Sequence, residues 1–570
     1  NTNATFLQNI NVGVAITAGT SGIGFTDTNV KIGQTAVDAL TTGTQNTGVG
    51  YFALTATTTG QNNTAVGSQA MESNTTGTSN TAMGRSSLDA NTTGDKNTAI
   101  GYKALAANTT ANENTAVGYD ALVANTTGTK NTAVGAEALD ANTTADRNTA
   151  IGYQSLSANT TGERNAAVGT YSLILNTTGG DNVAFGDAAL YNNSTASYNT
   201  AVGRSAMSQN TTGASNTALG YNALNSNTTA NNNVAVGYNA LTSSTTAYSN
   251  VAVGADALDA ATTGGENVAI GHGAMTDSTT GGACTAVGHQ AAANLTTAGY
   301  AVAIGHNAMG NAAVTGDHNC AVGRNSLYSL TSGTGNTASG GSACLYSVTT
   351  GEYNTAVGSD ALQNVTTSHR NTAIGMEAGY SVTTGANNVF VGNRAGHGHV
   401  TTANDQLYIA RSDAAAGNDG CWIFGNNTGT CHQGDNATTW GTISDQRLKK
   451  DIVDNNVGLS VINNVKVRNF KYKQYADGSP VSTGDTVDMS EFPKADNVKQ
   501  ILICQGKTET QLGVIAQELE SVAPDAVKTN ELTGAKTVDA DILFWHMLNA
   551  IKELSTKNDA LEARIQTLEG

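Results

Sequence analysis

The stretch NTAVGSQAMESNTTGTS, residues 63–79, is followed directly by NTAMGRSSLDANTTGDK, residues 80–96. The first asparagine of this pattern returns after every 17 residues, and with two steps of 18 the register runs from Asn29 to Asp405, which makes 23 units. A repeat this strict predicts a solenoid, in which each unit forms one coil that stacks on its neighbours.

Each unit reads N-T-A-V-G-x-x-A-L-x-x-N-T-T-G-x-x, and its third and fourth positions are both apolar, as in Ala65 and Val66. Side chains alternate across a β-strand, so these neighbours point to opposite faces. One face then lines the solenoid interior, and the other needs a partner surface. Because such short Ala and Leu segments would be too thin to fill a core within one chain, the pattern favours several chains packed around one axis.

Turn residues separate the predicted strands. The Gly after each strand and the N-T-T-G segment supply turns in which a positive φ angle is tolerated, and the recurring Gly and β-branched Thr argue against helix. At about 4.8 Å per stacked coil, the repeats would make a rod of roughly 110 Å. The sequence thus predicts a mainly β fold: a parallel β-solenoid or β-roll of 17-residue coils over residues 29–409, in a homotrimer.

The composition excludes several classes of protein. Only 12% of the 570 residues are charged and 5% aromatic, and the formal net charge of −17 argues against a nucleic-acid or anionic-membrane partner. No apolar run is long enough to span a membrane. The chain has no initiator Met and no signal peptide, so residues 1–28 are expected to continue from an upstream part. The six cysteines form no disulfide framework, although Cys421 and Cys431 could pair across a short loop.

Histidines supply the candidate metal ligands. His397 and His399 form an H-G-H motif, and on a strand their imidazoles would point the same way. Three chains would bring six imidazoles to the axis, which suits octahedral coordination of a transition metal. The alternative is an ordinary Gly-flanked pair in a loop. At the sixth position of three consecutive coils stand His272, His289 and His306, which we expect to form an exposed polar ladder; Tyr occupies this position in many other coils.

The composition changes after the repeats. Residues 410–443 carry Trp and Phe and predict a β-rich tip or collar that closes the open edge of the rod. From Ser444 the chain resembles a small mixed α+β domain, with strand-like alternation over 459–473 and a strand that continues as a helix over 511–527. Within the predicted coiled coil 543–570, apolar residues and one polar Asn are spaced alternately by four and three. They are Met547, Ile551, Leu554, Asn558, Leu561, Ile565 and Leu568. A single amphipathic helix packed on its own domain is the alternative.

Three C-terminal features together resemble one known family. SDQRLKKDI, GVIAQELESVAPDAV and the terminal heptad helix, all within 444–570, closely resemble the intramolecular chaperone domain of phage endosialidases and related tail spikes and fibres, peptidase family S74. The resemblance implies a domain that trimerises the fibre, assists folding of its β-stalk and then cuts itself off. It also implies that Ser444 is the nucleophile and Lys449 its general base, with cleavage between Ile443 and Ser444.

The stalk carries a second resemblance, to the β-roll heads of trimeric autotransporter adhesins, and NTAVGxxAL repeats also occur in phage tail-fibre shafts. Together these features predict a structural homotrimeric phage tail fibre or appendage on the virion. It would bind a bacterial cell-surface receptor, such as a glycan or outer-membrane component, and join the phage tail or baseplate through an upstream segment. A cellular trimeric surface adhesin with the same chaperone is the alternative, and a polysaccharide-degrading spike is weaker, because no coil offers a distinctive carboxylate pair. No cofactor is required, and no activity on external substrates is expected.

Overall fold

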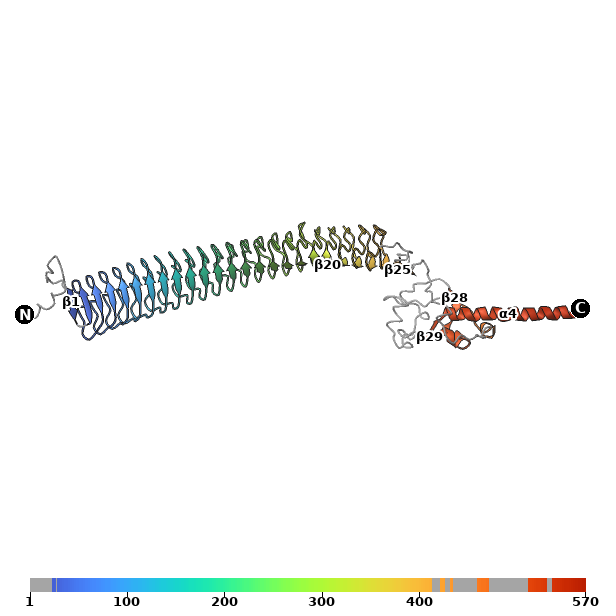
Figure 1. Cartoon of the computed structure of the whole chain (residues 1–570), viewed down its shortest axis with the longest axis horizontal. Helices are drawn as coiled ribbons and strands as arrows, with labels where there is room; N and C mark the ends of the chain where they lie inside the picture. Colours follow the sequence, from blue (N-terminus) through green and yellow to red (C-terminus); the bar gives the residue numbers. More distant parts are fainter. Residues whose placement is uncertain are drawn as a thin grey trace, which may run out of the picture. The chain divides into compact units, whose positions relative to one another are not determined.

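The computed structural model describes residues 23–26, 28–412, 421–425, 431–433, 459–470, 511–529 and 536–569. The chain divides into two compact units, 1–440 and 441–570. The first unit contains the stalk and the second contains the C-terminal domain (Figure 1).

The stalk is a parallel β-solenoid, as predicted. It begins at β2 (Asn29–Ile32), and each later strand pairs in parallel with the equivalent strand of the coil before it. Most strands are only three residues long and read Thr-Ala-Val or a close variant. Their bounds are β3 Thr47–Val49, β4 Thr64–Val66, β5 Thr81–Met83, β6 Thr98–Ile100, β7 Thr115–Val117, β8 Thr132–Val134, β9 Thr149–Ile151, β10 Ala166–Val168, β11 Val183–Phe185, β12 Thr200–Val202, β13 Thr217–Leu219, β14 Val234–Val236, β15 Val251–Val253, β16 Val268–Ile270, β17 Thr285–Val287, β18 Val302–Ile304, β19 Cys320–Arg324, β20 Thr337–Ser342, β21 Thr355–Val357, β22 Thr372–Ile374, β23 Val389–Val391 and β24 Leu407–Ala410.

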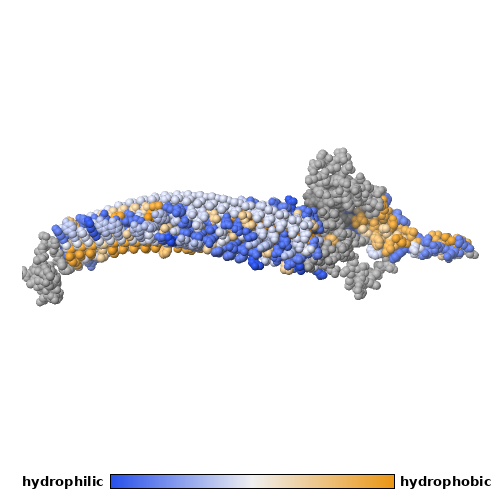
Figure 2. Space-filling view, turned by 90° about the horizontal axis from the view of Figure 1, so that it is seen from above, coloured by the Kyte–Doolittle hydropathy of each residue, from blue (hydrophilic) through white to orange (hydrophobic). Residues whose placement is uncertain are grey.

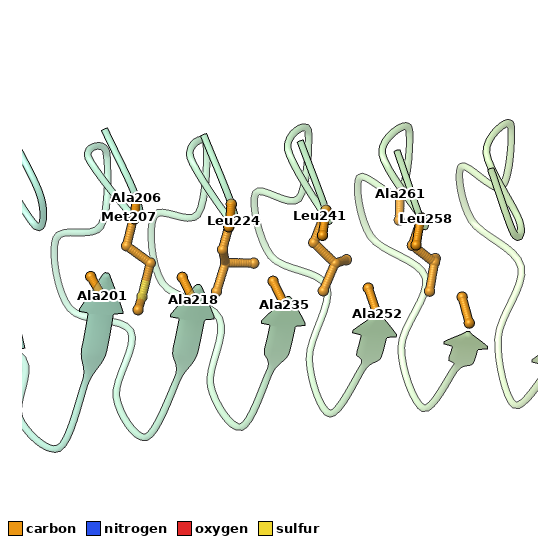
Figure 3. Packing of buried hydrophobic residues seen from close by; sticks show 14 of the residues in the cluster. Ala201, Ala206, Met207, Ala218, Leu224, Ala235, Leu241, Ala252, Leu258 and Ala261 are labelled. Atoms are coloured by element: carbon orange, nitrogen blue, oxygen red, sulfur yellow. The ribbon is translucent and has the colours of Figure 1, made fainter. Parts of the chain in front are cut away.

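The interior of the stalk is filled by one chain alone. In most strands the central residue is an Ala, such as Ala218, which points toward a Leu or Met from the opposite wall of the coil, such as Leu224, and both are fully buried (Figure 3). The coil is flat enough for these two small layers to touch. The expectation that so thin a core needs several chains is therefore wrong, and the number of chains must be argued from other surfaces.

Backbone conformation explains how so flat a coil closes. After the strand β4, Gly67 has a φ of 141°, and a Cβ there would lie 2.4 Å from the carbonyl oxygen of Gly84 in the next coil. Gln69 and Met71 then adopt φ angles of 62° and 51°, in the left-handed region that non-glycine residues seldom occupy. The same conformations recur in successive coils. The burial of the Leu or Met side chain holds this turn against its local preference.

Two internal ladders of asparagine side chains join the coils. At the first position of the repeat, Asn80 donates from Nδ2 to the carbonyl oxygen of Gly94 at 2.8 Å, and its Oδ1 accepts the backbone N–H of Asn97 at 2.8 Å. At the twelfth position, Asn91 donates to Oδ1 of Asn74 at 2.9 Å. These buried amides satisfy turn carbonyls that no strand reaches. They explain why Asn recurs at two positions of the repeat.

The structure corrects the repeat register at its C-terminal end. Val389 of β23 pairs with Leu407 of β24, a step of 18 residues, and the first position of this coil is Gln406 rather than Asp405. The reason is a hydrogen bond: the backbone N–H of Gln406 donates to Oδ1 of Asn388 at 2.8 Å, as Asn does in other coils.

Both ends of the stalk carry antiparallel strands. At the N-terminal end, β1 (Ile23–Thr26) pairs with β2, and at the other end β25 (Cys421–Gly425) pairs with β24 and β26 (Cys431–Gln433) with β25. The register places Cys431 opposite Gly425, four residues from Cys421. That separation is about 13 Å along a strand, whereas a disulfide joins Cα atoms less than about 7 Å apart. This strand register does not bring the two cysteines together.

The C-terminal unit is a small α+β assembly. Its helices are α1 (Leu459–Ile462), α3 (Ala516–Glu520), the 3₁₀ turn η4 (Pro524–Ala526) and the long α4 (Ala540–Glu569). Two antiparallel pairs accompany them: β27 (Val467–Phe470) with β28 (Gln511–Val514), and β29 (Val527–Thr529) with β30 (Lys536–Val538). The strand followed by a helix over 511–527 is confirmed.

The strand-like alternation predicted over 459–473 is only partly correct, because its first four residues form the helix α1. This helix packs against α4, and the backbone N–H of Leu459 donates to Oε2 of Glu553 at 3.2 Å. A tertiary contact with α4 thus overrides the local pattern.

Candidate assembly surfaces and the C-terminal domain

The outer surface of the stalk strands is a long uncharged face. The third-position residue of each strand, an Ala in most coils, is buried, while the residues at the second and fourth positions of the repeat point outward and are partly or fully exposed. We call the outward residues of strands β3 to β24 the strand face. The second positions hold mostly Thr and Val, and the fourth hold Val, Ile, Met, Leu or Phe in every coil but that of Ser339.

The fourth-position residues leave large apolar side chains in solvent. Phe185 is 56% exposed, Leu219 48% and Met83 44%. Figure 2 shows an apolar edge, drawn in orange, along the N-terminal part of the stalk. Contiguous apolar surface of this extent marks an interaction site in soluble proteins. The expectation that this side faces a partner stays a prediction.

The other exterior positions carry the charges. Arg164 donates two hydrogen bonds to Asp181 of the next coil, from Nε to Oδ1 at 2.7 Å and from Nη2 to Oδ2 at 2.9 Å. These hydrogen bonds lower the pKa of Asp181. Asp259 is half-buried, and its desolvation, reinforced by the carboxylates of Asp256 and Asp277, raises its pKa. These charged ladders lie away from the strand face.

The sixth-position aromatic and histidine residues stack on one another. His272, His289 and His306 are exposed, and their ring centroids are 5.2 and 5.1 Å apart with nearly parallel planes. Tyr221 and Tyr238 stack in the same way at 5.5 Å. The residues predicted to form an exposed ladder do form one.

His397 and His399 do not lie on a strand. They belong to a turn between β23 and β24, where Gly396 and Gly398 have φ angles of 69° and 75°, so the expectation of two parallel imidazoles on one strand is wrong. Glycine tolerates these positive φ angles, which the extended backbone of a strand does not contain. His397 stacks on Tyr380, with centroids 4.9 Å apart.

The nearest polar partners of His397 are protein side chains. Its Nε2 lies 3.4 Å from Oε2 of Glu377, and its Nδ1 lies 3.4 Å from Nη2 of Arg394. Among the described residues, no group of three or more His, Cys, Asp or Glu side chains is arranged to hold a metal ion. The ring of six imidazoles needs three chains, so this metal site stays a prediction.

In the C-terminal domain, the beginning of α4 packs on a small apolar cluster. Leu519, Ala523 and Ala526 are buried, and Ile542 and Leu543 of α4 pack against them. Beside this cluster, His546 is almost fully buried, and its Nε2 lies 3.0 Å from Oδ2 and 3.2 Å from Oδ1 of Asp525. This pair joins α4 to η4. Sequence reasoning missed it: Asp525 belongs to the GVIAQELESVAPDAV motif, but its partner His546 stands 21 residues further along the chain and no spacing rule pairs the two.

Further along α4, the heptad seam is uncovered. Six of its seven predicted members are large apolar residues about half exposed or more, from Met547 at 49% to Leu568 at 84%. Phe544, 56% exposed, continues the alternating spacing one step earlier, so the seam begins three residues before the predicted Met547. Asn558 donates to Oε1 of Glu562 at 3.1 Å. Among the described residues, α4 contacts its own domain in its first half, as far as Glu553.

The proposed cleavage residues Ile443, Ser444 and Lys449 lie outside the described residues, so the dyad stays a prediction. In the described part of the C-terminal domain, two ion pairs flank the sheet of β29 and β30: Lys536 contacts Glu520 at 2.6 Å and Lys528 contacts Asp539 at 2.8 Å.

Comparison with known families identifies the C-terminal region. Residues 444–528 match the peptidase S74 family, described as chaperone of endosialidase. No curated protein and no solved structure matches the chain. Of the helices in the described part of the chain, none has the length and hydrophobicity to cross a membrane. After its β-solenoid stalk, the chain therefore carries a domain of the endosialidase chaperone family.

Proposed function

We propose that the protein is the shaft of a homotrimeric phage tail fibre or appendage that contacts a bacterial cell, and that its C-terminal domain is the chaperone that brings three chains together. The family match at 444–528 carries this proposal. The uncovered seam of α4 supports it, because half-exposed apolar residues at heptad spacing are buried when identical helices coil together.

The physical need for such a chaperone follows from the repeat. Every coil of the stalk offers nearly the same outer surface, so three chains have many ways to meet and only one correct alignment. A C-terminal clamp that associates first reduces this search, because it fixes which coils face each other. The clamp would act before or while the stalk folds.

Self-cleavage is the second part of the proposal. Lys449 would take the proton of the Ser444 hydroxyl, and the oxygen would attack the carbonyl carbon of Ile443. The C–N bond between Ile443 and Ser444 breaks as the nitrogen of Ser444 takes up a proton, and water then hydrolyses the ester. Assembly must come first, because the chaperone is lost once the chain is cut.

Attachment to a host cell is proposed from the chaperone family and from the long stalk with polar outer ladders. The receptor would be a glycan or an outer-membrane component, and the fibre would be extracellular on the virion. A cellular adhesin with the same chaperone is the alternative: a tail-attachment domain in the same gene product would support the fibre, and a membrane anchor would support the adhesin.

The test is the mass of the purified full-length protein by light scattering, together with gel electrophoresis of boiled and unboiled samples. We expect a trimer that resists detergent until boiled. A monomer at micromolar concentration would contradict the proposal.

A further inference from the structure

We infer that the strand face is the surface by which the stalks of neighbouring chains pack together, and that its repeat cannot set its own register. This inference rests on the trimer proposed above and assigns its interface. The occupant of the face is a second copy of the same stalk.

Charge supports this assignment. From Thr47 at the start of β3 to Ile409 in β24, no second- or fourth-position residue of the strand face is Asp, Glu, Lys, Arg or His. Charges stand instead at the corners and on the other walls, as in Asp95 and Lys96. A surface in contact with water on all coils would have no reason to exclude charge along one side only.

The spacing between strands along the face indicates which kind of surface can pack against it. Neighbouring strands are about 4.8 Å apart, so the apolar side chains of successive coils form a row with that spacing along the whole stalk. Only a surface with the same spacing places a side chain between each pair over such a length. The same row of side chains on a second copy of the stalk has this spacing.

The size of the face is sufficient for stable association. Three residues per strand and one strand per coil give roughly 1,000 Å² of strand face per chain, compared with about 800 Å² per partner in a standard protein interface. The exposed Phe185, Leu219 and Ile374 lie within this area. The face is therefore large enough for the stalks to hold together along their length once they are aligned.

A repeating face does not by itself specify the register in which neighbouring chains align. A shift of one coil replaces Val or Ile by Val or Ile at most fourth positions, so it changes few contacts there. The steps of 18 residues, which pair Val302 with Cys320, Thr337 with Thr355 and Val389 with Leu407, add one residue outside the paired strand residues and occur only in the C-terminal part of the stalk. The α4 seam and these coils lie toward the same end of the sequence, which indicates that alignment starts there.

Cys320 is a native reporter of this interface. It occupies the second position of β19 on the strand face and is partly exposed, whereas Cys284 and Cys344 are buried inside the stalk. If three strand faces meet around one axis in register, the Cys320 thiols of neighbouring chains approach one another. A shift of one coil would separate them along the stalk.

The experiment uses the full-length chain with Cys421, Cys431 and Cys504 replaced by Ser, treated with a short bis-maleimide. We expect covalent dimers and trimers through Cys320. The matched control is Cys320→Ser with Ser332→Cys, which moves the thiol to an exposed position on another wall of the same coil and should give no cross-linked species. Cross-linking through Ser332→Cys but not through Cys320 would overturn the inference and leave the trimer intact.

A second set of variants probes the face by charge. Val134→Glu, Ile151→Glu and Val168→Glu together place three carboxylates on neighbouring strands of the face, and Thr127→Glu, Thr144→Glu and Thr161→Glu place them on an exposed wall of nearby coils. Both sets are made in the uncleaved Ser444→Ala background, where α4 still joins the chains, so both proteins should remain trimers by mass. The first should lose at least tenfold in heat resistance of the assembled stalk, measured as its half-life at a fixed temperature, and the second should not change. Equal half-lives would contradict the inference, and a wild-type monomer would contradict the proposed function as well.

Discussion

Asn227 donates its side-chain amide to Oδ1 of Asn210 at 2.7 Å, but its own Oδ1 is buried and has no hydrogen-bond partner among the described residues. The twelfth-position ladder of asparagines ends here, because the next coil carries Ser244. The Ser244 hydroxyl contacts the carbonyl oxygen of Ala247 instead, at 3.5 Å. One end of an amide ladder is thus left unsatisfied inside the stalk.

Ser244→Asn should repair this ladder. The new amide would donate to Oδ1 of Asn227, and the gain should be about 1 kcal/mol of unfolding free energy. Thermal unfolding of the stalk measures it as a higher Tm. Ser278→Asn is the matched control, since its neighbours at this position are Ala261 and Leu295 and it has no amide to join. No difference between the two variants would contradict the role assigned to the ladder.

Asp259→Asn should stabilise the stalk at neutral pH. Burial, and then the nearby carboxylates, raise the pKa of Asp259 above its usual value, so its contribution to stability is full below the unfolded pKa and is lost as the pH rises through the folded pKa. The variant should therefore melt at a higher temperature than wild type at pH 7, and the difference should shrink toward about pH 4. Thermal melts at several pH values check this.

Asp181→Asn is the control for Asp259→Asn, because its effect on stability should depend on pH in the opposite direction. The hydrogen bond from Arg164 lowers the pKa of Asp181, so its contribution is present above the unfolded pKa and is lost as the pH falls. This variant should be slightly less stable than wild type at pH 7 and equal to it in acid. A destabilised Asp259→Asn at pH 7 would contradict the sign derived for that residue.

Asp525→Ala should loosen α4 from its domain. It leaves the buried imidazole of His546 without its carboxylate, which should cost about 1–3 kcal/mol. Trp545, the residue before His546 in α4, reports unfolding of the C-terminal domain when Trp422 and Trp440 are replaced by Phe. Asp559→Ala, on the exposed part of α4, should have no effect.

The α4 seam should be needed for trimer formation. Deletion of residues 547–570 should give aggregates in place of soluble trimer. Ile551→Glu with Leu561→Glu should do the same, because the charges would be buried between helices. Thr556→Glu with Ala563→Glu, on the opposite side of the helix, should leave the yield of trimer unchanged by size-exclusion chromatography. Normal trimer from the seam variant would show that the clamp is dispensable.

The wild-type protein should release a C-terminal fragment that begins at Ser444. Ser444→Ala and Lys449→Ala should stay full length and trimeric, whereas Lys450→Ala should still be cut, because Lys449 is the residue that matches the family motif. N-terminal sequencing and intact mass of the fragment identify the bond. Cleavage of Ser444→Ala at this bond, or an intact wild type after prolonged incubation, would show that the dyad assignment is wrong.

The sequence by itself determined the solenoid, because units of constant length and pattern can each form one coil and stack on the next. It also determined the heptad seam and the chaperone family, since both depend on residues close together in the chain. The predicted seam begins at Met547, although the same spacing already includes Phe544.

Only the tertiary structure decided what fills the coil and what lies outside it. Alternation placed Ala218 and Leu219 on opposite faces, but whether one chain could close over Ala218 depended on how flat the coil is, and that follows from positive φ angles at bulky residues such as Leu224. The register at Gln406 and the helix at Leu459 were also set by tertiary contacts. A hydrogen bond to a neighbouring coil or helix is invisible to local pattern, because its two partners are joined by the fold and not by spacing in the sequence.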